Sequence, residues 1–356
     1  MSTLNKINAG RFFEDFTLNE VIQHATPRTI TAGDASLYIA LTGARNPLHC
    51  SEPFAGTLGY PSTPIDDLLA FHIAFGKTVP DISVNAVANL GYADVRFLQP
   101  VFTGDTLSTS SEVIGLKQNS NGKNGVVYVR STSINQHHQP VLSWVRWVMV
   151  HKNDASAPAP ETVIPELPAF VAAENLNVPR YFSAENFDAQ NTNGQYFWED
   201  YQTGERINHP SGMTINDSDH SLATRLYQNN ARLHFDAHAM QSSTFGKRLV
   251  YGGVVISACR ALSFEGLENA LSILAINAGT HANPCFAGDT IYSFTEVLDK
   301  WTLPNRNDVA ALRLRMIGIK NLAPTEISEI KQFNSYHPNV VLDLDYTVLM
   351  PRKGTH

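Results

Sequence analysis

Two short stretches of the sequence place a histidine beside side chains that can orient or transfer protons. The first is Leu41-Thr42-Gly43-Ala44-Arg45-Asn46-Pro47-Leu48-His49, and its counterpart, 185 residues later, is Leu226-Tyr227-Gln228-Asn229-Asn230-Ala231-Arg232-Leu233-His234. In the first stretch Pro47 forces Asn46 out of the helical region, so Asn46 and His49 project from a tight loop. Because histidine can take and give a proton near neutral pH, we expect acid–base chemistry at His49, at His234, or at both.

The correspondence between the two stretches extends along most of the chain. Phe13-Glu14-Asp15-Phe16 corresponds to Trp198-Glu199-Asp200-Tyr201, and Pro100-Val101-Phe102-Thr103-Gly104-Asp105 corresponds to Pro284-Cys285-Phe286-Ala287-Gly288-Asp289. A period this long indicates a duplicated domain, since solenoid repeats have periods of about 20–50 residues. We therefore predict an N-terminal domain over 1–153, a Pro-rich linker over 154–190 and a C-terminal domain over 191–356.

Hydrophobic periodicity predicts the same order of elements in each half. We expect a short strand within 13–31, a helix over 35–41 with Asp34 as its N-cap, and a long buried helix over 65–76 that ends at Gly76. Gly252-Gly253 opens the corresponding helix of the second half, over 254–264. Strands are expected at 83–97, 105–115, 126–134, 141–150, 271–279, 290–298, 310–319 and 340–350. Consecutive hairpins make a mostly antiparallel sheet, so we predict the α+β class.

The overall composition excludes several classes of protein. With 43% hydrophobic and 17% charged residues, the chain resembles an ordinary globular protein, and its net charge of −7 disfavours a dedicated nucleic-acid surface. The three cysteines have no metal-ligand spacing, which favours a reducing compartment. No run of 18 apolar residues and no signal-peptide pattern is present. We expect a cytoplasmic protein without a metal, an organic cofactor, a membrane or a nucleic acid as partner.

The first histidine stretch resembles a known signature. Gly43-Ala44-Arg45-Asn46-Pro47-Leu48-His49 is similar to the Gly-Asp-x-Asn-Pro-Leu-His motif of hydratases in the MaoC-like branch of the hot-dog fold, and the blocks at 100–106 and 284–290 are also typical of that family. The resemblance covers nearly the whole chain. It implies a double hot-dog, in which two repeats of an antiparallel sheet each wrap around a long central helix. It also implies a hydro-lyase for an enoyl-CoA thioester that forms a homodimer or a larger homo-oligomer.

The resemblance also narrows the expected substrate. The stretches at 64–69, 85–92 and 115–123 are similar to the part of this family that interconverts β-methylmalyl-CoA and mesaconyl-CoA. The same fold could also serve a hydratase for a different enoyl-CoA or a thioesterase. A protein of a different class, a non-catalytic acyl-CoA binding protein, is also compatible with the motif.

One departure from the family motif bears on the mechanism. The carboxylate of the motif is replaced by Ala44 in the first copy and by Asn229 in the second, and neither can act as a general base. Since Asn229 can still orient a water or the thioester, we expect His234 to carry the proton, with His49 as the second candidate. Asp66 or Asp67 could instead supply the missing carboxylate, although acidic residues in the first turn of a helix often serve only its dipole.

The resemblance also suggests where the acyl thioester binds, between the two hot-dog units and beside the central helices. The free N–H groups at a helix start suit the thioester oxygen. The expected substrate-binding residues are Asn46, Ile65, Asp66, Asp67, Asn89, Leu90, Gly91, Arg96, Gly252 and Gly253. Candidates to meet CoA phosphates or a substrate carboxylate are Arg45, Arg96, Arg180 and Lys123. We interpret Asp105 and Asp289 as turn residues and Cys259 as a core residue.

Overall fold

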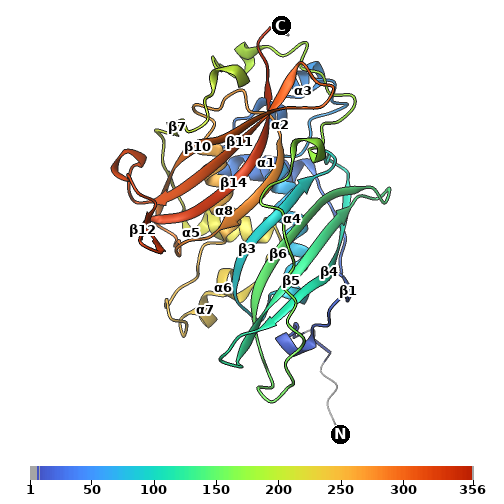
Figure 1. The fold of residues 1–356 in the computed structure, drawn as a ribbon, viewed down its shortest axis with the longest axis vertical. Helices are drawn as coiled ribbons and strands as arrows, with labels where there is room; N and C mark the ends of the chain where they lie inside the picture. Colours follow the sequence, from blue (N-terminus) through green and yellow to red (C-terminus); the bar gives the residue numbers. More distant parts are fainter. Residues whose placement is uncertain (1–5, 8, 355–356) are drawn as a thin grey trace.

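A single curved antiparallel sheet of twelve strands dominates the computed structural model, which describes residues 6–7 and 9–354 (Figure 1). The strands of the first half are β1 (Val21–Gln23), β2 (Arg28–Thr29), β3 (Ala86–Phe97), β4 (Thr106–Gln118), β5 (Asn124–Ile134) and β6 (Pro140–His151). Those of the second half are β7 (Arg206–Asn208), β8 (Met213–Thr214), β9 (Ile273–Thr280), β10 (Thr290–Thr302), β11 (Val309–Lys320) and β14 (Val340–Pro351). A separate hairpin pairs β12 (Lys331–Gln332) with β13 (Ser335–Tyr336).

The two halves join edge to edge through β3 and β9. The strand order is β1-β4-β5-β6-β3 in the first half and continues as β9-β14-β11-β10-β7 in the second. Tyr92 lies opposite Gly279, and Arg96 lies opposite Ala275, in an antiparallel ladder. Each half therefore completes its sheet by backbone hydrogen bonds to the other half.

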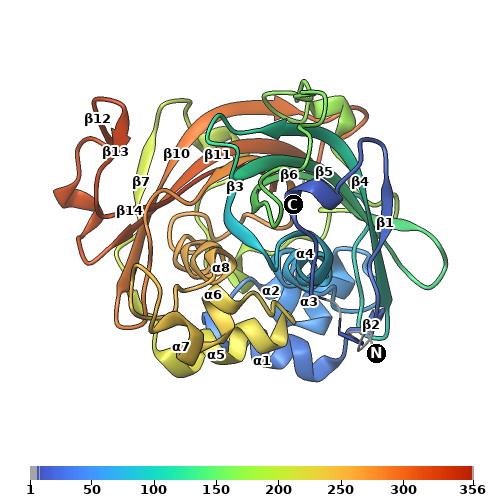
Figure 2. The same cartoon turned by 90° about the horizontal axis from the view of Figure 1, so that it is seen from below.

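The helices lie on the concave face of this sheet (Figure 2). The two central helices, α4 (Asp67–Ile82) and α8 (Gly252–Leu262), lie against the strands, and α1 (Ala32–Thr42) and α5 (Asp217–Leu226) lie farther from the sheet. The short helices are α2 (Pro47–Cys50), α3 (Glu52–Thr57), α6 (Arg232–Phe235) and α7 (Ala237–Met240). Two repeats of a sheet wrapped around a central helix confirm the predicted double hot-dog of the α+β class.

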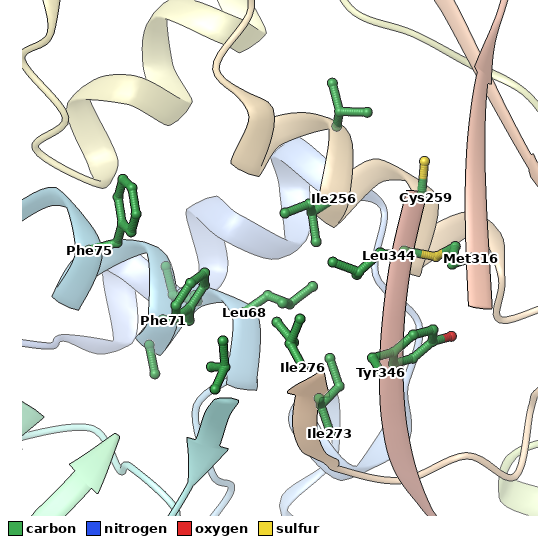
Figure 3. Close-up of a cluster of buried hydrophobic side chains, with 14 of the residues drawn as sticks. Leu68, Phe71, Phe75, Ile256, Cys259, Ile273, Ile276, Met316, Leu344 and Tyr346 are labelled. Atoms are coloured by element: carbon green, nitrogen blue, oxygen red, sulfur yellow. The ribbon is translucent and has the colours of Figure 1, made fainter. Parts of the chain in front are cut away.

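The largest hydrophobic core crosses the junction between the two halves. Leu68 and Phe71 of α4 gather with Ile256 of α8 and with Ile273 and Ile276 of β9 (Figure 3), and all five side chains are buried. Burying a large apolar side chain contributes about 1.5–3 kcal/mol, so much of this stabilisation depends on both halves being present. This shared core holds the two central helices in fixed positions relative to each other.

The predicted strands are confirmed to within a few residues, but three other predictions are wrong. The helix expected to end at Gly76 continues to Ile82. A Cβ at Gly76 would lie 1.9 Å from the carbonyl oxygen of Tyr227, so this glycine allows a close backbone approach and does not stop the helix. The helix α1 is capped by Thr31, whereas Asp34 completes its capping box from the third helical position. The range 13–31 was expected to begin with a short strand, but it begins with a 3₁₀ turn at Phe13–Asp15, and its strands β1 and β2 come later.

The Pro-rich segment over 154–190 runs along the outer face of the sheet. Val163 forms a β-bridge with Leu116, and Phe170 stacks on Trp301 with ring centroids 5.3 Å apart. Two 3₁₀ turns, η2 (Ala173–Asn175) and η3 (Ala189–Asn191), lie in or at the end of this segment, and η4 (Trp198–Asp200) follows. The proposed domain boundaries at 153 and 191 stay a prediction. Within the described ranges, none of the helices combines the length and the apolar character needed to cross a bilayer.

Candidate active site

The first histidine motif opens into a pocket that both halves of the chain build. Its first-half walls are the loop before α2 and the start of α4, and its second-half walls are α8 and the start of β9. The lining residues are Tyr38, Ala44, Arg45, Asn46, His49, Asp66, Asp67, Ser257, Arg260, Ala261, Phe264, Leu271 and Ile273. Five predicted site residues therefore meet in one place: Arg45, Asn46, His49, Asp66 and Asp67.

The local sequence fixes His49 at the wall of this pocket. Pro47 is the first residue of α2, and Asn46 is its N-cap, accepting the Leu48 N–H at 3.1 Å. The side-chain amide of Asn46 donates to the carbonyl oxygens of Leu271 at 2.9 Å and Ala270 at 3.3 Å. Asn46 thus ties the motif loop to the second half of the chain and orients the histidine.

His49 presents one ring nitrogen to the pocket as a proton acceptor. Its Nδ1 lies 3.1 Å from the carbonyl oxygen of Pro64. Because a carbonyl oxygen only accepts, Nδ1 carries the hydrogen in the neutral ring, and Nε2 is left with a free lone pair. Nε2 lies 3.8 Å from Oδ2 of Asp67, too far for a direct hydrogen bond but close enough for one water to bridge them.

Asp67 lies where a carboxylate can replace the one that is missing at Ala44. Its Oδ2 accepts the Ile273 N–H at 2.7 Å, and its side chain is 16% exposed. Burial raises the pKa of Asp67 to about 6; the charges of His49 and Arg260 oppose this rise, whereas that of Asp66 adds to it. Asp66 caps α4 by accepting the Leu68 N–H at 2.9 Å. The pocket therefore contains a histidine with a free ring nitrogen and a carboxyl group that can hold a proton near neutral pH.

The second motif has a different environment. The Nδ1 of His234 lies 3.0 Å from the carbonyl oxygen of Leu249, as the repeat requires. The position that corresponds to Asp67 is Gly252, where a Cβ would lie 2.2 Å from the ring of His281. In the described part of the chain, no carboxylate lies within 4 Å of His234. Asn229 is buried and accepts the Ala231 N–H at 3.3 Å.

Other buried aromatic and histidine side chains pack around His234. Its ring centroid lies 5.4 Å from that of Tyr251 and 6.3 Å from that of His220. Burial lowers the pKa of His220, His234 and His281 to about 4. The neutral rings are therefore favoured at physiological pH. His220 accepts the Tyr251 N–H at 3.2 Å, and His281 contacts the Tyr92 hydroxyl at 3.0 Å. The prediction that His234 carries the proton stays untested. Of the two motif histidines, His49 has a carboxylate within 4 Å and His234 has none among the described residues.

The remaining predicted binding residues lie outside the pocket of His49. Asn89, Leu90, Gly91 and Arg96 lie on β3, where Arg96 forms an ion pair with Asp94 at 2.7 Å. Gly253 and Ile65 lie next to helix starts but do not line the pocket. Arg180 and Lys123 are exposed. The expected turn roles of Asp105 and Asp289 are confirmed, since they accept the N–H groups of Phe102 and Phe286, and Cys259 is fully buried.

Several residues that line the pocket were not predicted from the sequence, because they belong to the second half of the chain or contact a residue of that half. Tyr38 donates to Oγ of Ser257 at 3.0 Å, and Ser257 also contacts Nε2 of His72 at 3.1 Å. His72 and Ser257 occupy equivalent positions of the repeat, 185 residues apart. A helix position with polar residues in both copies was the available signal. No cluster of three or more His, Cys, Asp and Glu side chains that could hold a metal ion occurs among the described residues.

Comparison with known proteins identifies relatives of this chain over nearly its whole length. Residues 15–135 match the family model "MaoC like domain". The chain is 55% identical to a β-methylmalyl-CoA dehydratase of Chloroflexus aurantiacus over 98% of its length and 99% of the relative's. It is 53% identical to a mesaconyl-CoA hydratase of Cereibacter sphaeroides, over 98% and 100% of the two chains.

Solved structures lead to the same family. A MaoC domain protein dehydratase from Chloroflexus aurantiacus superimposes with a TM-score of 0.96 at 55% identity, covering 98% of this chain and 100% of the other. A Mycobacterium tuberculosis protein with a double hot-dog fold, 24% identical, superimposes with a TM-score of 0.72 over 96% and 98% of the two chains and supports the fold alone. From its motif, its fold and its identity to these relatives over nearly their whole length, the chain belongs to the MaoC-like dehydratase family.

Proposed function

We propose that this chain catalyses the reversible addition of water to mesaconyl-CoA, which gives β-methylmalyl-CoA, and that His49 and Asp67 carry the protons. The observation that carries the proposal is the pair formed by His49 Nε2 and Asp67 Oδ2, 3.8 Å apart in a pocket between the two halves. The names of the relatives that are 53–55% identical support the same substrate and the hydro-lyase class.

In the direction of hydration, the reacting water binds between these two groups. Nε2 of neutral His49 takes a proton from the water as its oxygen bonds to the β-carbon. The C=C electron pair moves toward the thioester, and protonated Asp67 delivers its proton to the α-carbon. The proton on His49 then returns to Asp67, so the net reaction adds one water. Dehydration runs through the same steps in reverse.

The start of α4 can stabilise the charge that develops on the thioester oxygen. Asp66 caps the helix through the Leu68 N–H, while the other first-turn N–H groups have no acceptor within the helix. The partial positive charge at a helix N-terminus favours a developing oxyanion. The same short segment would therefore supply the proton donor, Asp67, and the groups that bind the oxyanion.

A thioesterase activity has one structural feature in its favour, but that feature is buried. Nε2 of His24 lies 2.8 Å from Oγ of Ser111, and Nδ1 of His24 lies 2.8 Å from Asp81, as in a Ser-His-Asp triad. Ser111 is 1% exposed and does not line the pocket of His49. His209 contacts Thr295 in the same way in the second half, at 2.8 Å. This repetition indicates a structural network.

The test is a kinetic comparison of the two histidines, which bond to equivalent carbonyl groups and so serve as matched variants. Loss of enoyl-thioester absorbance reports hydration, and a thiol reagent reports free CoA. We expect His49→Ala to lower kcat about 10²–10⁴-fold, the usual contribution of a general acid–base, and His234→Ala to leave kcat nearly unchanged. The reverse pattern would place the active site in the second copy.

The same two readouts distinguish a hydratase from a thioesterase and from an acyl-CoA binding protein. Release of free CoA without loss of the double bond would identify a thioesterase. An enoyl-CoA that binds while neither its absorbance nor the free thiol concentration changes would identify a binding protein. Faster turnover of an enoyl-CoA without a free carboxylate would reject mesaconyl-CoA as the preferred substrate. A cytoplasmic location and a homodimeric or larger assembly stay predictions, and analytical ultracentrifugation tests the latter.

A further inference from the structure

Arg260 brings an unpaired positive charge from the second half of the chain to the pocket of the first. It lies in the last turn of α8, is partly buried and lines the pocket together with His49 and Asp67. The charge of Arg260 contributes to lowering the pKa of Asp67, so it acts across the pocket. The proton-transfer pair and this guanidinium thus face the same space from opposite halves.

The hydrogen-bonding capacity of Arg260 is largely unused. Its Nη1 lies 3.4 Å from Oγ of Ser263, and its Nη2 lies 3.4 Å from the carbonyl oxygen of Ala270. Both contacts are long for N–H···O bonds, and a guanidinium has five N–H donors. Within the described ranges no carboxylate lies within 4 Å of Arg260, whereas Arg45, which also lines the pocket, forms an ion pair with Glu265 at 3.1 Å.

We infer that Arg260 binds the free carboxylate of the acyl group and thereby selects a dicarboxylic enoyl-CoA. This inference rests on the proposed function and names the residue that sets its substrate class. The carboxylate of mesaconyl-CoA is attached to the β-carbon, the atom that receives the water oxygen. A guanidinium can hold such a planar group with two parallel hydrogen bonds.

Arg260 would also offset the repulsion between the substrate carboxylate and the acidic side chains of the pocket. The substrate carboxylate enters a pocket that already contains Asp66 and Asp67. Without a cation it would repel both and raise the pKa of Asp67 further. Arg260 offsets this repulsion. An enoyl-CoA that ends in a methyl group leaves the guanidinium partly desolvated and unpaired, which disfavours its binding.

The kinetic test compares two thioesters that differ in one group. Tiglyl-CoA has the α-methyl group and the double bond of mesaconyl-CoA but a methyl group in place of the carboxylate. We expect Arg260→Gln to lower kcat/KM for mesaconyl-CoA about 10²–10³-fold, the loss of a charge-assisted bidentate contact, and to change the value for tiglyl-CoA less than about 3-fold. Arg260→Lys should recover part of the loss. Arg225→Gln, which changes an exposed arginine on α5, is the matched control.

A binding measurement keeps the inference independent of turnover. Isothermal titration of wild type and Arg260→Gln with succinyl-CoA and butyryl-CoA compares the same acyl chain with and without a terminal carboxylate. The variant should lose affinity for succinyl-CoA and keep its affinity for butyryl-CoA. Equal losses for both would show that Arg260 contacts the common CoA portion and would overturn the inference. If wild type hydrates neither enoyl-CoA, the proposed function fails, and the titration still decides the role of Arg260.

Discussion

Replacing Asp67 by Asn should stabilise the protein while it removes activity. Asp67 is held in a buried position, where its pKa is raised from 3.8 to about 6. A pKa shift of one unit corresponds to about 1.4 kcal/mol. Ionising Asp67 is therefore less favourable in the folded protein than in the unfolded chain by about 3 kcal/mol. Asparagine has no charge and can still accept the Ile273 N–H through its Oδ1. The substitution therefore removes an unfavourable ionisation and keeps the hydrogen bond.

The stability difference between Asp67→Asn and wild type should depend on pH, and the raised pKa of Asp67 determines in which direction. Below about pH 4 the carboxyl group is protonated in the folded and the unfolded state, so aspartic acid and asparagine differ little. Between about pH 4 and pH 6 the folded protein keeps a proton that the unfolded chain has released, and wild type loses stability as the pH rises. Above that range Asp67→Asn should be more stable than wild type by up to about 3 kcal/mol.

Urea unfolding followed by circular dichroism at three pH values measures this difference. Asp66→Asn is the matched control, because asparagine caps a helix about as well as aspartate. It removes only the smaller contribution of the Asp66 charge to the pKa of Asp67, so its gain in stability at high pH should be smaller than that of Asp67→Asn. Steady-state assays should show a loss in kcat of at least about 10²-fold for Asp67→Asn. A destabilised Asp67→Asn protein at high pH, or a difference that does not change with pH, would refute the view that Asp67 is ionised against a burial cost.

Two further predictions concern the fold. A fragment ending at Lys152 should aggregate or self-associate, because it exposes the edge of β3 that bonds to β9; a cooperatively unfolding monomer in analytical ultracentrifugation would contradict this. Gly76→Ala should lower the free energy of unfolding by about 1–3 kcal/mol or more, since its Cβ would lie 1.9 Å from the Tyr227 carbonyl oxygen. Gly56→Ala in α3, where a Cβ meets nothing within 4 Å, should be neutral or stabilising by up to about 1 kcal/mol, and urea unfolding followed by circular dichroism measures both glycine variants.

The elements with a strong local pattern were predictable from the sequence. The alternating run 126–134 corresponds to β5 (Asn124–Ile134) because successive side chains of a strand point to opposite faces of the sheet. Gly76 shows the limit of local signals. A glycine can end a helix or permit a close contact, and the group that approaches it is Tyr227, which is distant in the sequence.

The contacts within the candidate site were not predictable either, because they join residues that are distant in the sequence. The sequence favoured His234 as the proton carrier, with His49 as the second candidate. It allowed Asp66 or Asp67 as a replacement carboxylate, but it could not distinguish that role from that of a simple helix-terminal acid. That choice depends on the N–H of Ile273, 206 residues away. Arg260 was not recognised at all, because a single arginine near the end of an apolar helix has no pattern that points to a ligand. Both contacts exist only after the two halves pair.

On the proposed assignment of the active site to His49 and Asp67, the two equivalent helix starts explain why a duplicated chain needs only one complete site. At the start of α4 the repeat has Asp67, and at the start of α8 it has Gly252, whose missing Cβ leaves room for the ring of His281. A carboxylate and that ring cannot occupy the same space, so the second motif has His281 packed where the first has an acid. The second half nevertheless supplies Ser257, Arg260 and the Ile273 N–H to the first pocket. It can therefore lose its own proton-transfer pair without becoming dispensable, because the first site is assembled on its surface.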